Sequence, residues 1–171
     1  ALTYDGSSVT AIRGFDHLEG ETLGLIVDGG AHPDVTVTNG AISLNRSGSV
    51  VQCGLKYTYV LCPSRLEAGA NDGTAQAKMK RITDVGVRVW KSLGGSIGRS
   101  LDPEDLTLMR DLNYRQPVTQ MDTPEPLKST DIIQNFPKGS NRDGFIYITG
   151  DDGFPMNVIA LFPQVETREA R

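Results

Sequence analysis

The feature that most constrains the fold is a series of short alternating segments separated by Asp-Gly and Asn-Gly pairs. Apolar and polar residues alternate over 22–27, 34–38 and 41–44, with Asp28-Gly29 and Asn39-Gly40 between these segments. Alternation with a period of two is typical of half-buried strands. Asp-Gly and Asn-Gly readily adopt the positive φ angles that two-residue hairpin turns require. The sequence therefore predicts an antiparallel meander in this part of the chain.

The same turn pairs recur along the whole chain. A glycine follows each of Asp5, Asp28, Asn39, Asp72, Asp143 and Asp152. The 171 residues include 19 Gly and 9 Pro, which indicates many turns and few long helices. A chain of this length holds one ordinary domain or two small ones, and it can bury a core without disulfide bonds. We therefore predict a mainly β fold with few or no helices.

We expect a small antiparallel β-barrel over residues 14–62, because closure removes the exposed edges of several short strands. Its predicted strands lie near 22–27, 34–38, 41–44, 49–53 and 56–61. Residues 1–13 are expected to form a lead-in strand or a linker, and residues 63–74 a loop. A second β-rich unit, built as an antiparallel sheet, is expected over 75–171.

Within this second unit, the alternating and apolar segments indicate further strands. They lie at 82–90, 129–136, 144–150 and 155–162. The segment 155–162 is apolar enough for a central strand covered on both faces. Residues 74–85 also allow a short helical turn, and residues 101–116 fit a helical turn as well as a strand. A Pro-rich surface loop is expected at 117–126.

The charge of the chain argues against a protein dedicated to nucleic acid. The formal net charge is -4, whereas phosphate binding needs Lys and Arg clustered on one face. At most a weak nucleic-acid contact through a local patch is expected. The apolar stretches are shorter than about eighteen residues, so we expect no membrane span, and we expect no signal peptide. Because residues 1–6 resemble the end of a strand already under way, we also expect a fragment of a longer protein.

The candidate metal ligands are the two histidines, His17 and His32, and the two cysteines, Cys53 and Cys62. Two His and two Cys can hold zinc, but these residues lack the paired spacing that brings ligands onto one turn. We therefore expect no metal and no cofactor, with His17 packed on or bonded to a turn and His32 extended before Pro33. The spacing of the cysteines allows a disulfide, and free thiols are favoured.

The acidic clusters have simple explanations as turns and loops. Asp151-Asp152-Gly153 resembles the start of a calcium loop, but the other ligands of such a loop are missing. Asp102, Glu104 and Asp105 are too close in sequence to act from opposite sides of a cleft. The sequence contains no nucleophile elbow, phosphate-binding loop or zinc-protease motif. We therefore predict no enzymatic activity, no catalytic residues and no small-molecule substrate.

Basic residues gather in the middle of the chain, in a span whose only acidic residue is Asp84. They are Lys78, Lys80, Arg81, Arg88, Lys91 and Arg99. On a strand, Arg88 shares a face with Gly86 and Trp90 that points away from the core, because the valines between them occupy the opposite face. An ordinary solvated surface explains this pattern. The alternative is a subunit-contact face that meets an acidic neighbour, such as residues 102–111 of an adjacent copy, or, less favoured, DNA.

Several of these segments also resemble a known family. The runs are GFDHLEGET (14–22), DGGAHPD (28–34) and VTNG (37–40), followed by DGTAQ (72–76), VGVRVWKSLGG (85–95) and a closing segment from Phe136-Pro137 to Pro163. They resemble virion structural proteins of tailed bacteriophages, of the tail nozzle or tubular tail type. The first three runs are similar to a small β-barrel first named in ubiquitin-activating enzymes. The adenylation domain and catalytic cysteine of those enzymes have no counterpart here, so this likeness implies no activity.

The resemblance implies a structural role in the tail of a virion, encoded by a free phage or a prophage. The chain would belong to a ring or conduit for DNA ejection, made in the bacterial cytoplasm and contacting copies of itself and other tail proteins. An acidic conduit also suits DNA, because like charge does not grip a polyanion. The alternative function is a module that binds a host-surface glycan or protein through residues 101–126, where Tyr114 is the only aromatic residue. An enzyme acting on cell-wall polymers is disfavoured.

Overall fold

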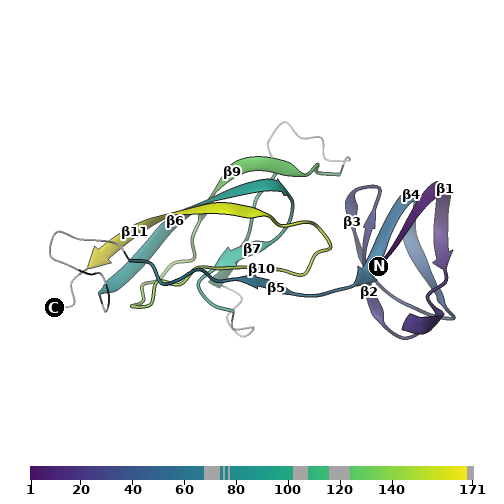
Figure 1. The fold of residues 1–171 in the computed structure, drawn as a ribbon, viewed down its shortest axis with the longest axis horizontal. Helices are drawn as coiled ribbons and strands as arrows, with labels where there is room; N and C mark the ends of the chain where they lie inside the picture. The colour runs from purple at the N-terminus through teal and green to yellow at the C-terminus, as the bar shows by residue number, and fades with distance from the viewer. Residues whose placement is uncertain (68–73, 75, 77, 102–107, 116–123, 169–171) are drawn as a thin grey trace. The chain divides into compact units, whose positions relative to one another are not determined.

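The structure is a computed structural model that describes residues 1–67, 74, 76, 78–101, 108–115 and 124–168. Over these residues the chain is mainly β, with three antiparallel sheets, no α-helix and one short 3-10 turn, η1 (Asp16–Leu18). The chain divides into two compact units (Figure 1). The first comprises Ala1–Thr58, Arg115–Pro126 and Asp151–Pro155, and the second comprises Tyr59–Tyr114, Leu127–Gly150 and Met156–Arg171.

The first unit contains a four-stranded sheet in the order β1-β4-β2-β3. Its strands are β1 (Leu2–Arg13), β2 (Thr22–Val27), β3 (Gly30–Thr36) and β4 (Ala41–Leu55). The predicted reversals are confirmed: Asp28 and Gly29 have φ angles of 49° and 79°, and Asn39 and Gly40 have φ angles of 54° and 64°. Residues 1–13, expected as a strand or a linker, form β1 and pair with β4.

The first unit is not a barrel, because none of the three sheets closes on itself. The segments 41–44 and 49–53, which we expected to be separate strands, form the single 15-residue strand β4. The expected strand at 56–61 survives only as β5 (Tyr59–Leu61), which belongs to the second unit. The sheet therefore keeps β1 and β3 as its edges, and within the part of the chain that the structure describes no further strand joins them.

The core of the first unit lies on one face of this sheet. The alternation of β2 buries Leu23, Leu25 and Val27, each with at most 5% of its surface exposed. Gly48 lies where β4 passes over Val27, and a Cβ at this position would clash with the Val27 side chain. A bulkier residue at 48 would therefore separate β4 from the core. The other buried apolar residues are Ile12, Phe15, Val37, Ile42, Leu44, Val51 and Cys53.

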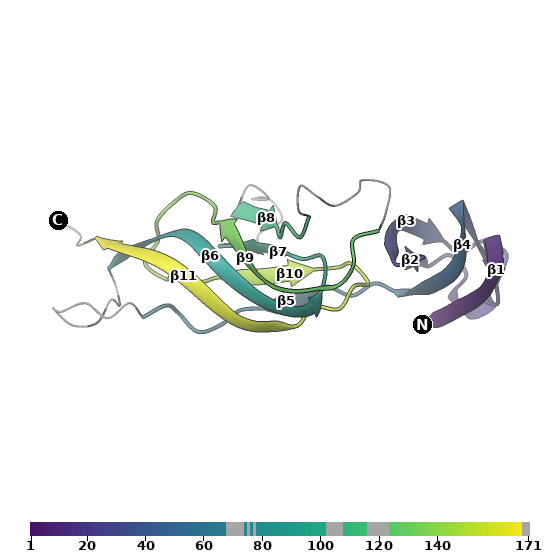
Figure 2. The same cartoon turned by 90° about the horizontal axis from the view of Figure 1, so that it is seen from above.

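The second unit contains two sheets that share one core. The four-stranded sheet has the order β5-β10-β7-β8 and the three-stranded sheet has the order β11-β6-β9 (Figure 2). Their strands are β6 (Met79–Ser92), β7 (Ser96–Gly98), β8 (Met109–Asp111), β9 (Lys128–Asn135), β10 (Tyr147–Gly150) and β11 (Val158–Arg168). The core joins residues from both sheets, including Val87 from β6, Ile97 from β7, Ile132 from β9 and Ile148 from β10.

Strand β6 shows the predicted alternation of buried and exposed residues. Strand β11, in contrast, lies at the edge of its sheet and not at the centre as predicted. Val85, Val87 and Val89 are at most 2% exposed, whereas Trp90 on the opposite face is 51% exposed. The prediction that 155–162 is a central strand covered on both faces is wrong. Strand β11 begins at Val158, lies at the edge of its sheet and leaves Ile159 and Phe162 exposed. The sequence of β11 resembles that of a buried strand because apolar residues occur on both of its faces, although one face is exposed.

Several predicted segments lie partly outside the described residues. Of the segment 101–116, residues 102–107 and 116 lie outside them, and Met109–Asp111 forms the strand β8. Of the Pro-rich loop at 117–126, only 124–126 are described. Within the part of the chain that the structure describes, no helix is long and apolar enough to cross a membrane.

Candidate interaction surface

The outward face of the three-stranded sheet is the most distinctive surface of the second unit. We call it the outer sheet face and define it by Gly86, Arg88 and Trp90 of β6, Asp131 and Ile133 of β9, and Phe162 of β11. Gly86 is paired with Ile133 on one side and with Phe162 on the other, so these three residues form a row across the sheet. Ile133 is 77% exposed and Phe162 is 48% exposed. The row is therefore apolar and faces away from the core.

Arg88 ties the three strands together on this face. Its Nε and one terminal nitrogen each donate to a carboxylate oxygen of Asp131, both at 2.7 Å. The guanidinium carbon also lies 5.0 Å from the centre of the Phe162 ring, in a cation–π geometry. Hydrogen bonding to Asp131 raises the pKa of Arg88, and hydrogen bonding to Arg88 lowers the pKa of Asp131. The charge at the centre of the outer sheet face is therefore neutralised within the sheet.

Trp90 and Lys91 extend the same surface towards the end of β6. The Lys91 ammonium lies 4.9 Å from the centre of the exposed Trp90 ring. Lys91 has a φ of 45°, and its backbone N–H donates to the Ser129 hydroxyl at 2.9 Å. This left-handed residue interrupts the regular pairing of β6 with β9, which has an irregularity between Val89 and Ser92.

The six basic residues predicted as a contact face are not gathered on one face. Arg88 and Lys91 lie at the outer sheet face, and the exposed Arg81 is paired with Glu166 of β11. Lys78 precedes β6 and is half-buried, as is Arg99, which follows β7. Lys80 is 3% exposed, and its ammonium donates to the Arg142 carbonyl at 2.9 Å. Lys80 therefore cannot contribute to a contact surface, because its alternation with Arg81 places it inside.

In the first unit, the carboxylates of Glu19 and Asp28 in the turn-rich segment bind backbone N–H groups. The Glu19 carboxylate accepts hydrogen bonds from the N–H groups of Asn39 and Gly40, both at 2.8 Å. The Asp28 carboxylate accepts from the N–H groups of Ser49 and Val50 at 3.0 and 2.8 Å. The Glu19 carboxylate thus satisfies two donors of the turn between β3 and β4, and the Asp28 carboxylate, at the turn between β2 and β3, satisfies two donors of β4. These residues hold the turns of the sheet in place.

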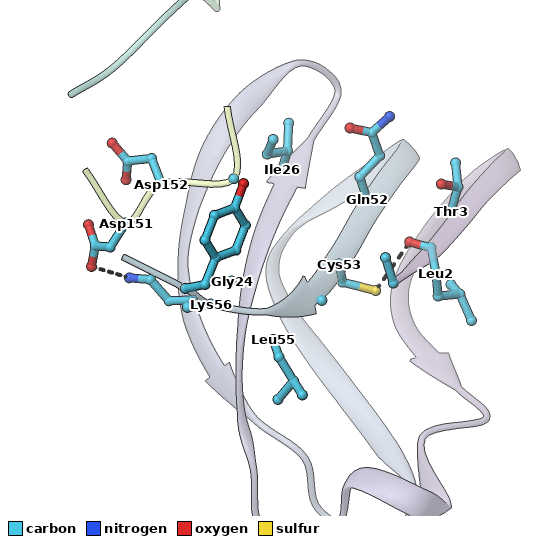
Figure 3. Close-up of a pocket in the computed structure, with 14 residues that line it drawn as sticks. Leu2, Thr3, Gly24, Ile26, Gln52, Cys53, Leu55, Lys56, Asp151 and Asp152 are labelled. Carbon is cyan, nitrogen blue, oxygen red and sulfur yellow. Dashed lines mark hydrogen bonds and ion pairs between the residues drawn. The ribbon is translucent and has the colours of Figure 1, made fainter. Parts of the chain in front are cut away.

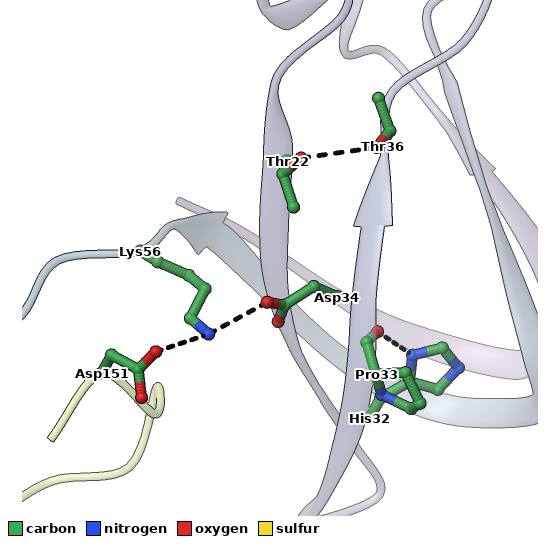
Figure 4. Close-up of polar contacts among 7 residues, drawn as sticks. All are labelled: Thr22, His32, Pro33, Asp34, Thr36, Lys56 and Asp151. Atoms are coloured by element: carbon green, nitrogen blue, oxygen red, sulfur yellow. Dashed lines mark hydrogen bonds and ion pairs between the residues drawn. The ribbon is translucent and has the colours of Figure 1, made fainter. Parts of the chain in front are cut away.

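His32 also has a structural role. It is 7% exposed, and its Nε2 accepts a hydrogen bond from the Asn45 N–H at 3.1 Å. This acceptor role assigns the proton to Nδ1, which lies 2.7 Å from the Pro33 carbonyl and donates to it (Figure 4). The ring therefore links β3 to β4. The other histidine, His17, is exposed in η1.

Lys56 is paired with two carboxylates in the first unit. Its ammonium lies 3.0 Å from an oxygen of Asp34 and 2.9 Å from an oxygen of Asp151 (Figure 4). These hydrogen bonds raise the pKa of Lys56 to about 12. Asp151, which we considered as the start of a calcium loop, therefore serves as a partner for a cation of the protein itself.

The first unit also contains a pocket of about 270 Å³ at the ends of β1, β2 and β4 (Figure 3). Leu2, Ile26, Cys53 and Leu55 line it with apolar residues, and Thr3 and Gln52 are among its neutral polar residues. The Cys53 thiol donates to the Leu2 carbonyl at 3.6 Å, and burial raises its pKa. A buried thiol with a raised pKa is a weak nucleophile.

The other candidate ligands and catalytic groups remain scattered. Cys53 is buried and Cys62 is exposed, and neither is in a disulfide bond. Among the described residues, no group of three or more His, Cys, Asp or Glu side chains is placed to hold a metal ion. Asp102, Glu104 and Asp105 lie outside the described residues. Tyr114 is 6% exposed and packs in the core, so it offers no surface on which a sugar could stack.

The apolar half of the outer sheet face was not predicted. The sequence analysis identified Arg88, Gly86 and Trp90 as outward, but it did not place Ile133 or Phe162 beside them. The Ile132-Ile133 pair carries the available signal, since neighbouring residues on a strand point to opposite faces. Comparison of the chain with models of known protein families and with curated proteins finds no match.

Proposed function

We propose that this chain is a structural, non-enzymatic component of a bacteriophage tail. It would be a fragment of a nozzle-type protein and form part of a ring or conduit for DNA ejection. The observation that carries the proposal is the structural role of acidic side chains in the segments that resemble such proteins. Glu19 and Asp28 lie within those segments, and their carboxylates bind backbone N–H groups of a turn and of the strand β4, respectively. These side chains stabilise the fold, as expected of a structural protein.

The composition and the surface of the chain support the same role. The net charge of -4 suits a protein that lets DNA pass without holding it. A ring requires one surface of each subunit to meet a different surface of the next. Rigid sheets with exposed apolar residues, such as Ile133 and Phe162, offer surfaces that such contacts can cover. Arg81 and Lys91 remain the proposed basic part of a subunit contact, next to the Arg88–Asp131 pair.

Immunogold electron microscopy of purified phage particles tests this proposal directly. An antiserum raised against the chain should place gold on the tail of the virions that carry its gene. Mass spectrometry of the same particles should detect its peptides together with those of the capsid. Antiserum that has been absorbed with the purified chain is the control. Intact, infectious particles that lack these peptides would contradict the proposal.

The same purified chain separates this proposal from the host-binding alternative. A structural component should not label intact host cells and should give no signal on a glycan array. Saturable labelling of the host surface, lost when cell-surface polysaccharide is removed, would instead support a receptor-binding module.

A further inference from the structure

The edges of the three sheets differ in how they are protected. An edge strand leaves backbone N–H and C=O groups without a partner, and proteins prevent unwanted pairing with prolines, bulges or very short strands. Strand β3 contains Pro33, and β11 contains Pro163 with two irregularities in its pairing. Strand β1 has two irregularities, and β5 and β8 have three residues each. Each of these five edges therefore carries a protective feature.

Strand β9 is the exception among the edges. It lies at the end of the order β11-β6-β9, and among the described residues it pairs with β6 alone. From Thr130 to Asn135 it pairs with β6 residue by residue, with no proline and no irregularity. Its central residue on the outer sheet face is Ile133, which is 77% exposed. A regular edge without proline or bulge, with an exposed isoleucine at its centre, is a template for another strand.

We propose that β9 docks on β9 of a second copy of this chain, as an antiparallel pair related by a two-fold axis at Ile133. The two three-stranded sheets then join into one continuous sheet. Residues that face outward in one copy lie opposite residues that face outward in the other. Ile133 therefore stacks on the partner's Ile133, and Asp131 lies opposite the partner's Asn135.

The charges and the apolar row favour a second copy as the occupant. The only charged residue between 130 and 135 is Asp131, and Arg88 of its own sheet already neutralises it. Two copies of an acidic chain can therefore pair along residues 130–135 of β9 without opposing like charges. The pairing also extends the row of Phe162, Gly86 and Ile133 into the same row of the partner, which covers the most exposed of these side chains.

This inference does not rest on the proposed tail function. A two-fold contact is closed and cannot by itself build a ring, so a ring would need a second, head-to-tail interface. A chain that dimerises through β9 but is absent from virions would sustain the inference and contradict the proposed function. A monomeric chain found in virions would do the reverse.

Sedimentation velocity over a wide concentration range, with the whole 171-residue chain, provides the first test. The chain should form dimers, and Ile133→Lys should raise the dissociation constant by about ten-fold or more, because two lysines then face each other at the axis. The matched control is Ile159→Lys on the protected edge β11, where the isoleucine is 61% exposed. This control should dimerise normally. A monomer at every concentration, or equal effects of both substitutions, would overturn the inference.

Disulfide trapping tests the two-fold register. Ile133→Cys in a Cys62→Ser background should form a covalent dimer on mild oxidation, since paired Cβ atoms across antiparallel strands lie about 4.5–5.5 Å apart. Ile159→Cys in the same background should stay monomeric on a reducing-agent-free gel. Urea unfolding of each variant checks that the fold is unchanged. Equal trapping at both positions, or none at 133, would contradict a β9 pair.

Discussion

In the first unit the acidic side chains of the turns bind backbone amides, whereas in the second unit the charged side chains of the outer sheet face bind each other. Glu19 satisfies two N–H groups of the turn between β3 and β4, and Asp28 satisfies two N–H groups of β4. Arg88 and Asp131 instead form a planar, two-bonded pair on an open sheet. The first arrangement uses polar groups to fix the course of the chain. The second leaves a flat, neutral and partly apolar surface, which is suited to contact with another protein.

The largest test of this contrast compares the two sides of β9. Ile132 is 6% exposed and belongs to the core, while its neighbour Ile133 is 77% exposed. Ile132→Ala should lower the free energy of unfolding by about 2 to 5 kcal/mol, because it leaves a cavity between the two sheets. Ile133→Ala should change it by less than about 0.5 kcal/mol. Urea unfolding at low protein concentration, followed by the fluorescence of Trp90 in the same unit, measures both.

Equal costs for these two substitutions would remove the distinction between an inner and an outer face. A large cost for Ile133→Ala alone would mean that the outer sheet face is covered within the monomer. Either result would also undermine β9 as a docking edge.

The second test concerns Tyr114 in the core of the second unit. Burial raises the pKa of Tyr114 to about 12 from its usual value of 10.0. The neutral phenol is therefore favoured in the folded state, and its contribution to stability is complete below pH 10 and is lost as the pH rises towards 12. The loss should reach about 2 to 3 kcal/mol, at 1.36 kcal/mol for each pKa unit.

Tyr114→Phe is the matched variant for this test. Its loss at neutral pH should be within about 1 kcal/mol, since the hydroxyl donates only a long bond of 3.8 Å to the Met156 sulfur. The variant should lose less stability than the native chain between pH 9.5 and about 11.5. Chemical unfolding followed by circular dichroism gives the difference, in which the titration of other groups cancels. A difference that is independent of pH would mean that Tyr114 is solvated.

The sequence was sufficient for the fold class and for the local reversals, because both depend on short-range chemistry. Asp28-Gly29 and Asn39-Gly40 turn where predicted, since few other pairs accept two consecutive positive φ angles. The alternation of Val85, Val87 and Val89 likewise predicted which side of β6 is buried.

The failures concern long-range pairing. Residues 41–44 and 49–53 were expected as two strands, yet Gly48 allows β4 to continue over Val27 as one strand, and this removes a corner that a barrel would need. The position of β11 at an edge depends on which strand lies beside which. The same holds for Ile133 and Phe162, which only the register places on either side of Gly86.

The third test concerns the turn between β3 and β4, which the Glu19 carboxylate holds. Glu19→Ala removes an acceptor shared by the N–H groups of Asn39 and Gly40, and it should cost about 1 to 2 kcal/mol. Glu19→Gln keeps one acceptor oxygen and should cost about half as much. The control is Glu21→Ala, which removes the same charge but keeps the backbone bonds of Glu21 to Leu18 and Val37. Hydrogen exchange at the amides of 39 and 40 should accelerate only in the Glu19 variants.

The smallest expected effect belongs to Lys56, and it separates the two causes of a raised pKa. The pKa of Lys56 is about 12, as for Tyr114, but its cause is pairing with Asp151 and Asp34 rather than burial. Its stabilising effect is present below pH 10.5 and is lost as the pH rises through 12.

Because these groups are partly exposed to solvent, Lys56→Met should cost less than about 1 kcal/mol at neutral pH. Since salt screens exposed ion pairs, about 0.5 M NaCl should abolish this cost while leaving the alkaline effect of Tyr114 unchanged. A salt-independent cost at Lys56 would mean that its aliphatic stem, and not its charge, stabilises the first unit.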